Sequence, residues 1–233
     1  EKINTCIPYT GISAGTDVEG VFGIGKSILQ IKNVFAFGTL SPYRVSLPSA
    51  NTVNARKENL RIAYLWNVYN IKPEDFYLFA GPSVGANLGI RINNGELANS
   101  VLTYEGAGNL SFAAKAIKYF NLNDDDKSYP KRFKLEANLV TSVFSRVFTP
   151  SYTGIGTEGL SEALTIIDIN SNYFGSLHNY TDIETSLSLT YFLKNRNGIE
   201  LGYYCNYVGT KPKVNEAKSC LSMFEMKFTY NLK

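Results

Sequence analysis

The sequence is poor in the residues that metal and nucleophilic sites need. It has a single histidine, His178, and three cysteines scattered along 233 residues. Zinc and iron sites require clustered His and Cys ligands, so we expect no metal and no other cofactor. Net charge is only +3 and basic residues form no run, so we expect no nucleic acid as partner.

Long apolar runs are also missing. No segment approaches the roughly 20 consecutive apolar residues of a membrane-spanning helix. A strand needs only about 9–11 residues to cross a bilayer, apolar at alternate positions, so this absence leaves strands as the spanning element. Sixteen Tyr and fourteen Phe favour strands, and the length suits one β domain. The start lacks an apolar signal segment, so Glu1 is interpreted as the first residue of a mature, signal-cleaved chain.

Alternation with period two is the main positive signal. From Asp182 to Lys194 the odd positions are mostly apolar and the even positions mostly polar, as a strand between two environments requires. Asn195-Arg196-Asn197-Gly198 then ends in Asn-Gly, a strong tight-turn signal. The same pattern predicts eight strands, at 28–41, 58–70, 75–91, 100–119, 131–148, 180–194, 198–208 and 220–232.

The polar faces of these strands carry both acids and bases, whereas the apolar faces are almost uninterrupted. A small barrel must pair the charges it encloses, so we expect the charged faces inside and the apolar faces toward lipid. A soluble lipocalin-like barrel, with the opposite orientation, is the alternative. The predicted interior charges are Arg61, Arg91, Glu105, Lys115, Arg132, Lys134, Glu136, Arg146, Glu184, Glu200, Glu225 and Lys227.

The repeated strands, the turn at Asn195–Gly198 and the aromatic terminal strand Phe224–Leu232 resemble small bacterial outer-membrane β-barrel proteins over residues 28–232. The chain departs from them by ending in Leu232-Lys233 rather than in an aromatic residue. The resemblance implies an all-β, closed antiparallel up-and-down transmembrane barrel in the bacterial outer membrane, with eight strands or, alternatively, ten. Residues 28–233 would form the barrel, and residues 1–27 a periplasmic tail, a plug or extra strands.

Loop lengths fit this topology. Connections at 71–74 and 195–197 are tight and 120–130 is moderate, whereas those at 42–57, 149–179 and 209–219 are long, although 92–99 is not. Such barrels place short turns in the periplasm and long loops outside. We therefore expect segment 149–179 to bind a partner, with Tyr152, Tyr173, Phe174 and His178 as candidate contacts. Expected partners are the lipid bilayer and either another outer-membrane protein or a surface glycan.

Three functions remain open. The first is a non-enzymatic barrel whose external loops bind a membrane partner, and the second is a narrow pore for small solutes. The third is a lipid-modifying enzyme in which His178, Ser176 and Asp182 form a hydrolytic triad. An exposed loop histidine is the favoured interpretation of His178, so no catalytic residue is assigned.

Two further motifs can each be explained without a function. Gly20–Ser27 fits the phosphate-loop pattern GxxxxGK[ST], but the strand before it and the helix after it are not predicted, so coincidence is preferred. Cys205 and Cys220 flank a polar loop between two predicted strands. They form either a disulfide that closes the hairpin or two free thiols, because sequence does not fix their geometry.

Overall fold

The computed structural model describes residues 9–42, 52–71, 75–93, 102–121, 131–148, 172–210 and 217–230. These residues form an all-β structure. The ten strands are β1 (Tyr9–Ile24), β2 (Ser27–Pro42), β3 (Val53–Ile71), β4 (Phe76–Asn93), β5 (Leu102–Phe120), β6 (Phe133–Phe148), β7 (Asn172–Ser176), β8 (Tyr180–Phe192), β9 (Gly198–Thr210) and β10 (Ala217–Thr229).

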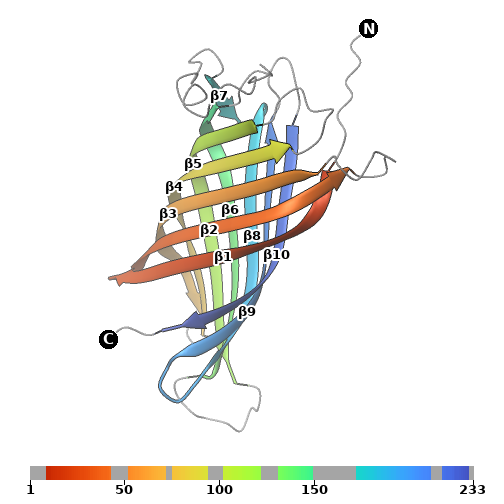
Figure 1. The fold of residues 1–233 in the computed structure, drawn as a ribbon. Helices are drawn as coiled ribbons and strands as arrows, with labels where there is room; N and C mark the ends of the chain where they lie inside the picture. The colour runs from red at the N-terminus through yellow and green to blue at the C-terminus, as the bar shows by residue number, and fades with distance from the viewer. Residues whose placement is uncertain are drawn as a thin grey trace.

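The strands form one sheet that curls into a nearly closed barrel (Figure 1). Each strand pairs antiparallel with the next along the chain, from β1 to β6 and then through β8 and β9 to β10. The short β7 pairs only with the carboxyl-terminal residues of β6, Phe144–Phe148, on the same edge of β6 where β8 pairs with Phe133–Thr141. The wall therefore has nine strands, and the chain enters at one end of the barrel and leaves at the other (Figure 1).

The strand count corrects the sequence prediction of eight. Strands corresponding to all eight predicted segments are present, and the two additional ones are β1 and β7. β1 has a weak hydrophobic pattern because it is rich in glycine. At Gly15, an added Cβ would collide with the carbonyl oxygen of Phe35 on β2, so the close approach of the two backbones requires glycine there. β7 lies inside the segment predicted as a long loop.

Two tight turns show how the local sequence determines the hairpins. Gly25 and Lys26 alone connect β1 to β2, with Gly25 at φ +60°, as the first position of a type II′ turn requires. The phosphate-loop pattern is thus a β-hairpin, with no helix to bind phosphate. In the turn before β9, Arg196 takes the positive φ of 66°, and Asn197 accepts a hydrogen bond from the Leu193 amide.

Connection lengths separate the two ends of the barrel. The strand ends that precede and follow residues 25–26, 72–75, 121–132 and 193–197 lie at the end of the barrel where β10 finishes. The strand ends on either side of residues 43–52, 94–101, 149–171 and 211–216 lie at the opposite end, where β1 begins (Figure 1). We call these the turn end and the loop end.

The wall is apolar outside and polar inside. On β8, Leu187 and Leu189 are exposed on the outer surface, whereas Glu184 and Thr190 are buried in the interior. Only small apolar clusters are enclosed, one around Leu65, Phe79 and Val140 and the other around Ala107, Val147 and Tyr180. The orientation expected from the sequence is therefore the one that the structure has.

Candidate functional site: the charged barrel interior and its outer wall

Most of the enclosed charges form one continuous network of ion pairs. Lys32 on β2 bridges Asp17 on β1 (3.4 Å) and Glu184 on β8 (3.6 Å). Glu184 also pairs with Arg61 on β3 at 2.9 Å. All four side chains are at most 7% exposed, so strands from both halves of the chain are joined across the lumen.

The second arm of the network runs through β5, β6, β9 and β10. Lys115 is almost completely buried between Glu136 (2.7 Å) and Glu19 (3.2 Å). Lys134 continues from Glu136 (2.9 Å) to Glu200 (3.8 Å).

Lys227 closes this arm back onto β1. It contacts Glu200 at 3.8 Å, Glu225 at 2.9 Å and Asp17 at 2.5 Å. A burial this deep is tolerated because each charge has a partner, and loss of one partner from such a pair costs about 3–5 kcal/mol.

Asp182 organises the part of the lumen nearer the loop end. Its carboxylate accepts hydrogen bonds from the side-chain amides of Asn87 (2.7 Å), Asn109 (2.8 Å) and Asn206 (2.7 Å), and Arg61 lies 3.5 Å away. Asn87 adds β4 to the network, so every strand of the nine-stranded wall contributes a polar side chain to it. The interior is therefore a fixed polar plug.

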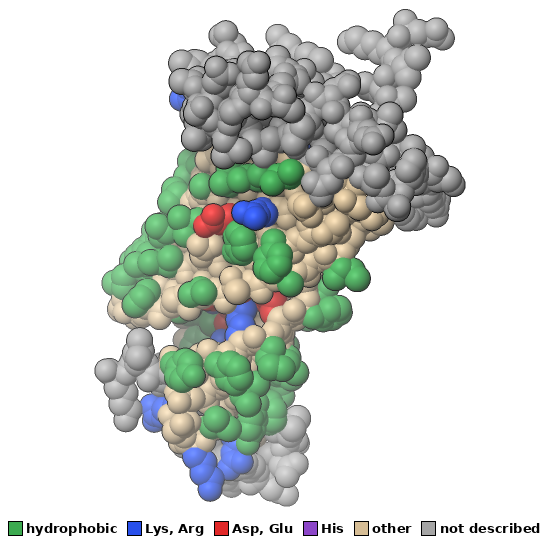
Figure 2. Space-filling view, in the orientation of Figure 1, with side chains coloured by type: hydrophobic (Ala, Val, Ile, Leu, Met, Phe, Trp, Pro, Cys, Tyr) green, Lys and Arg blue, Asp and Glu red, His purple; other side chains and the backbone are tan. Residues whose placement is uncertain are grey.

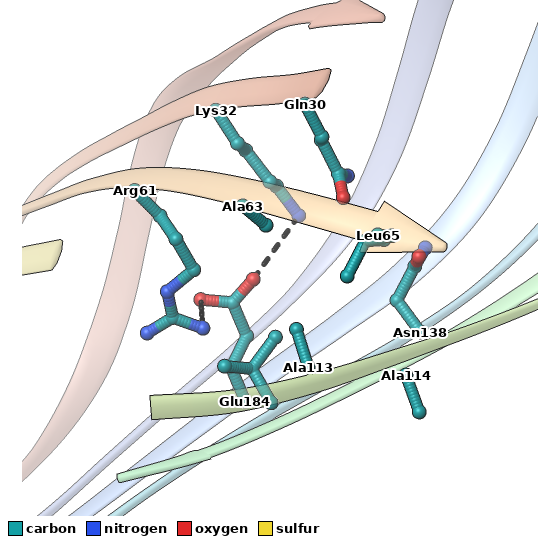
Figure 3. A pocket seen from close by; sticks show the side chains of 10 residues that line it. Gln30, Lys32, Arg61, Ala63, Leu65, Ala113, Ala114, Asn138 and Glu184 are labelled. Atoms are coloured by element: carbon teal, nitrogen blue, oxygen red, sulfur yellow. Dashed lines mark ion pairs between the residues drawn. The ribbon is translucent and has the colours of Figure 1, made fainter. Parts of the chain in front are cut away.

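Little space remains inside this plug. A cavity of about 10 Å³ is lined by Lys32, Arg61 and Glu184, with Ala63 and Leu65 beside it; Figure 3 shows these side chains. A second cavity, of about 30 Å³, lies toward the loop end beside Lys57, Asn87 and Tyr180. A cavity must offer about 10–15 Å³ to hold one water molecule, so each of these cavities has room for one or two waters.

Most of the predicted interior charges lie inside the barrel, although two do not. The residues buried or half-buried on the inner face are Arg61, Arg91, Glu105, Lys115, Lys134, Glu136, Glu184, Glu200, Glu225 and Lys227. Arg132 precedes β6 and is exposed. A β-bulge at Val143 inserts one extra residue into β6 and so reverses the alternation of side chains after it. As a result, Arg146 points outward and is exposed, and Val147 points into the barrel.

Sequence reasoning missed four members of the network: Asp17, Glu19, Lys32 and Asp182. Asp17 and Glu19 lie on β1, within residues 1–27, for which extra strands were only one of three alternatives. Lys32 alternates with buried Val34 and Ala36 on the inner face of β2, so a mixed interior hid the pattern. Two acids spaced by two residues, as in Asp17-x-Glu19 and Asp182-x-Glu184, were the available signal, because this spacing places both on one face.

The candidate partner-binding residues lie near the loop end, on different faces. Phe174 on β7 is 77% exposed and points outward, whereas Tyr173 packs against the cluster of Val147 and Tyr180. His178 is exposed in the turn between β7 and β8. Tyr152 falls outside the described residues. The structure therefore brings Phe174 and His178 to the surface, together with Leu177 at 63% exposure.

The proposed hydrolytic triad is not assembled. The Nδ1 atom of His178 lies 2.5 Å from Oγ of Ser176, in an exposed turn. Asp182 instead points into the lumen, where the three asparagines and Arg61 hold its carboxylate. An acid that orients the histidine is required for the triad mechanism, and Asp182 does not supply it.

Cys205 on β9 and Cys220 on β10 are neighbours on the outer face. Their sulfur atoms are 4.0 Å apart, and both are free thiols in the structure. The pair lies diagonally across two hydrogen-bonded strands, with Cys205 opposite Ser222 and Cys220 opposite Tyr207. Of the two alternatives left open by the sequence, the structure has the free thiols, with both placed on the same side of the same hairpin.

Every strand of the nine-stranded wall carries large apolar side chains on its outer surface, and Figure 2 shows such side chains on one face of the barrel. Those at least 50% exposed include Val18, Phe22, Phe37, Trp66, Val84, Phe144, Leu187, Leu201, Phe224, Met226 and Phe228. At the turn end, Phe133 stacks on Phe120 with ring centroids 5.5 Å apart and lies 5.2 Å from the ring of Tyr191. An aromatic cluster thus borders the apolar wall at this end.

The described residues contain no helix with the length and hydrophobicity needed to cross a membrane. Within the same ranges, no three His, Cys, Asp or Glu side chains are arranged to hold a metal ion. Comparison of the chain with known protein families, curated proteins and solved structures gives no match.

Proposed function

We propose that the protein is a bacterial outer-membrane β-barrel without enzymatic activity, whose loop end binds a partner at the cell surface. The observation that carries this proposal is the polarity of the wall, with paired charges inside and large apolar side chains outside. A monomer in water rarely exposes apolar patches larger than a few hundred Å², and lipid is the environment that suits such a surface. The strands of the nine-stranded wall have 13–19 residues, which exceeds the roughly 9–11 residues needed to cross a bilayer.

The surface near Phe174, Leu177 and His178 is the proposed partner site. These side chains lie at the loop end, beyond the point where β8 joins the wall, and two of them are large, apolar and exposed. Aromatic residues are enriched among the residues that dominate binding energy at interfaces. Another outer-membrane protein or a surface glycan would meet the barrel here.

A pore for small solutes is the second candidate, and the filled lumen argues against it. The ion-pair network joins opposite sides of the interior, and the cavities have volumes of only about 10 and 30 Å³. A small barrel whose interior is filled by side chains leaves no continuous water column. Planar-bilayer recording of the purified protein is expected to show no conductance steps, and regular steps would favour the pore instead.

Membrane fractionation combined with gel mobility tests the proposal. The chain is expected in the outer-membrane fraction, and the folded barrel is expected to migrate differently before and after boiling. A chain that stays folded and monomeric in buffer without detergent would overturn the membrane assignment.

A further inference from the structure

The barrel has a seam between its first and last strands. Within the described residues, β1 has backbone partners only on β2, and β10 only on β9. The backbones of β1 and β10 also lie farther apart than those of paired neighbours. Each strand therefore presents a free row of N–H and C=O groups, which is a template for one more strand. In lipid these groups have no water to bond, so leaving them unpaired costs several kcal/mol for each group.

Strand direction defines what fits between these edges. Eight successive antiparallel pairings separate β1 from β10, so both run in the same direction. One segment running the opposite way would pair antiparallel with both and complete a ten-stranded cylinder. A second copy of this chain in the same membrane orientation offers only parallel edges, so it is a poorer match.

Side chains at the seam define the composition of the missing strand. On the outer side, Ile12 on β1 and Phe224 on β10 are 90% and 91% exposed, so an apolar neighbour would cover them. On the inner side, Asp17 Oδ1 and Glu225 Oε1 are buried without a hydrogen-bond donor among the described residues. Figure 2 shows acidic and basic side chains in a recess between the regions that β1 and β10 occupy in Figure 1.

Charge balance favours a basic side chain at this point. The ion-pair network contains seven carboxylates (Asp17, Glu19, Glu136, Asp182, Glu184, Glu200 and Glu225) and five cations (Lys32, Arg61, Lys115, Lys134 and Lys227). The excess of two carboxylates falls to one when Lys57, whose Nζ is buried and whose charge interacts with that of Asp182, is included, and a single lysine or arginine on the added strand would compensate it. The Asp17–Lys227 ion pair lies on the inner side of the wall, so it does not occupy the hydrogen-bonding position of an added strand.

We propose that the seam accepts one extended segment of another polypeptide, antiparallel to both β1 and β10. Its outward side chains are apolar, and a lysine or arginine points inward between Asp17 and Glu225. This is strand addition at a sheet edge, in which backbone hydrogen bonds provide affinity and alternate side chains provide specificity. The inference rests on the proposed membrane barrel and identifies the chemistry of a partner that barrel would take.

The test uses two synthetic peptides that copy Gly198–Thr210, the strand that already pairs antiparallel with β10. Both carry C205S, and they differ only in whether Glu200 is retained or replaced (E200K). Purified full-length protein in detergent micelles, checked first for heat-modifiable mobility, is mixed with each peptide. Affinity is measured by fluorescence anisotropy, and hydrogen–deuterium exchange maps the backbone amides of β1 and β10.

The E200K peptide is expected to slow exchange on both β1 and β10 and to bind about tenfold or more tightly than the Glu200 peptide, as a charge-assisted hydrogen bond would give. In the E225Q variant, and in D17N/E225Q if it folds, that preference should fall toward unity while strand addition persists. E225Q alone keeps the test interpretable, because Asp17 continues to bind Lys227 in it.

Several results would overturn the inference. Protection of β1 and β10 before any peptide is added would mean that the chain closes its own seam. Equal affinity of the two peptides would show that no basic side chain is preferred between Asp17 and Glu225. Slower hydrogen exchange on strands other than β1 and β10 would show that the peptide binds elsewhere. Failure of the proposed function would give a different result, namely a chain that folds in buffer without detergent. Hydrogen exchange on β1 and β10 can be measured in that buffer too, so the seam is tested independently.

Discussion

A single arginine on the outer wall distinguishes a lipid-facing surface from a water-facing one. Leu187 is 54% exposed near the middle of β8, midway between Ile183 and Tyr191 on the same face. An arginine at the bilayer midplane destabilises a transmembrane barrel by about 2–4 kcal/mol, and the effect falls to about 0–1 kcal/mol near the interface. In water, replacing an exposed leucine by arginine changes stability by about 0.5 kcal/mol or less.

The matched control is Leu193→Arg, in the turn between β8 and β9, where the side chain is 43% exposed at the turn end. Urea titration of the protein folded into phosphatidylcholine vesicles gives the free energy of unfolding for both variants. Trp66, the only tryptophan of the chain, is 50% exposed on the outer wall, so its fluorescence reports on the transition. We expect Leu187→Arg to lose about 2–4 kcal/mol and Leu193→Arg about 1 kcal/mol or less. Equal, small losses in both would refute the lipid-facing assignment.

Three further predictions follow from the interior and the hairpin of β9 and β10. Lys115→Ala leaves Glu19 without its cation and Glu136 with Lys134 as its one remaining cation, so it should lower the free energy of unfolding by about 3–5 kcal/mol in the same titration. Lys131→Ala, which removes a half-exposed ion pair, should cost about 1 kcal/mol or less, and similar losses in the two variants would contradict the buried network. Mild oxidation should link Cys205 to Cys220 and remove two of the three titratable thiols, as mass spectrometry of alkylated protein would show, whereas three remaining thiols would exclude the bond. Phe174→Ala should leave heat-modifiable mobility unchanged, because its side chain is 77% exposed, and loss of the folded band would assign Phe174 to the barrel's stability instead.

The alternation of apolar and polar residues was enough to predict the strands of the barrel wherever one face of a strand is consistently apolar and the other consistently polar. Around Leu187, each outward position is apolar or Thr and each inward position is polar, so strand, register and orientation all follow from the sequence. Arg146 shows where this reasoning fails. One extra residue at Val143 inverts every later side chain of β6, and nothing local to the sequence marks the bulge.

Extra strands were only one of three alternatives for residues 1–27, which include β1, and the reason is a different one. The inner face of β1 carries glycines at 11, 15 and 23 besides Asp17 and Glu19, its outer face is interrupted by Gly20, and its pairing with β2 depends on backbone contact more than on side-chain pattern. The composition of the interior could be predicted as a mixture of charges. The specific pairs could not, because they join strands far apart in the chain, such as Lys32 with Glu184.

The odd number of wall strands has a consequence for the topography of the termini. In a bilayer, Tyr9 at the start of β1 and Thr229 at the end of β10 would face opposite compartments. If that bilayer is the outer membrane, as proposed, an epitope placed before β1 would be reached by antibody from the cell exterior, whereas one placed after β10 would be reached only in broken cells. Insertion from the periplasm would then require the amino-terminal end of β1 to be carried across the membrane.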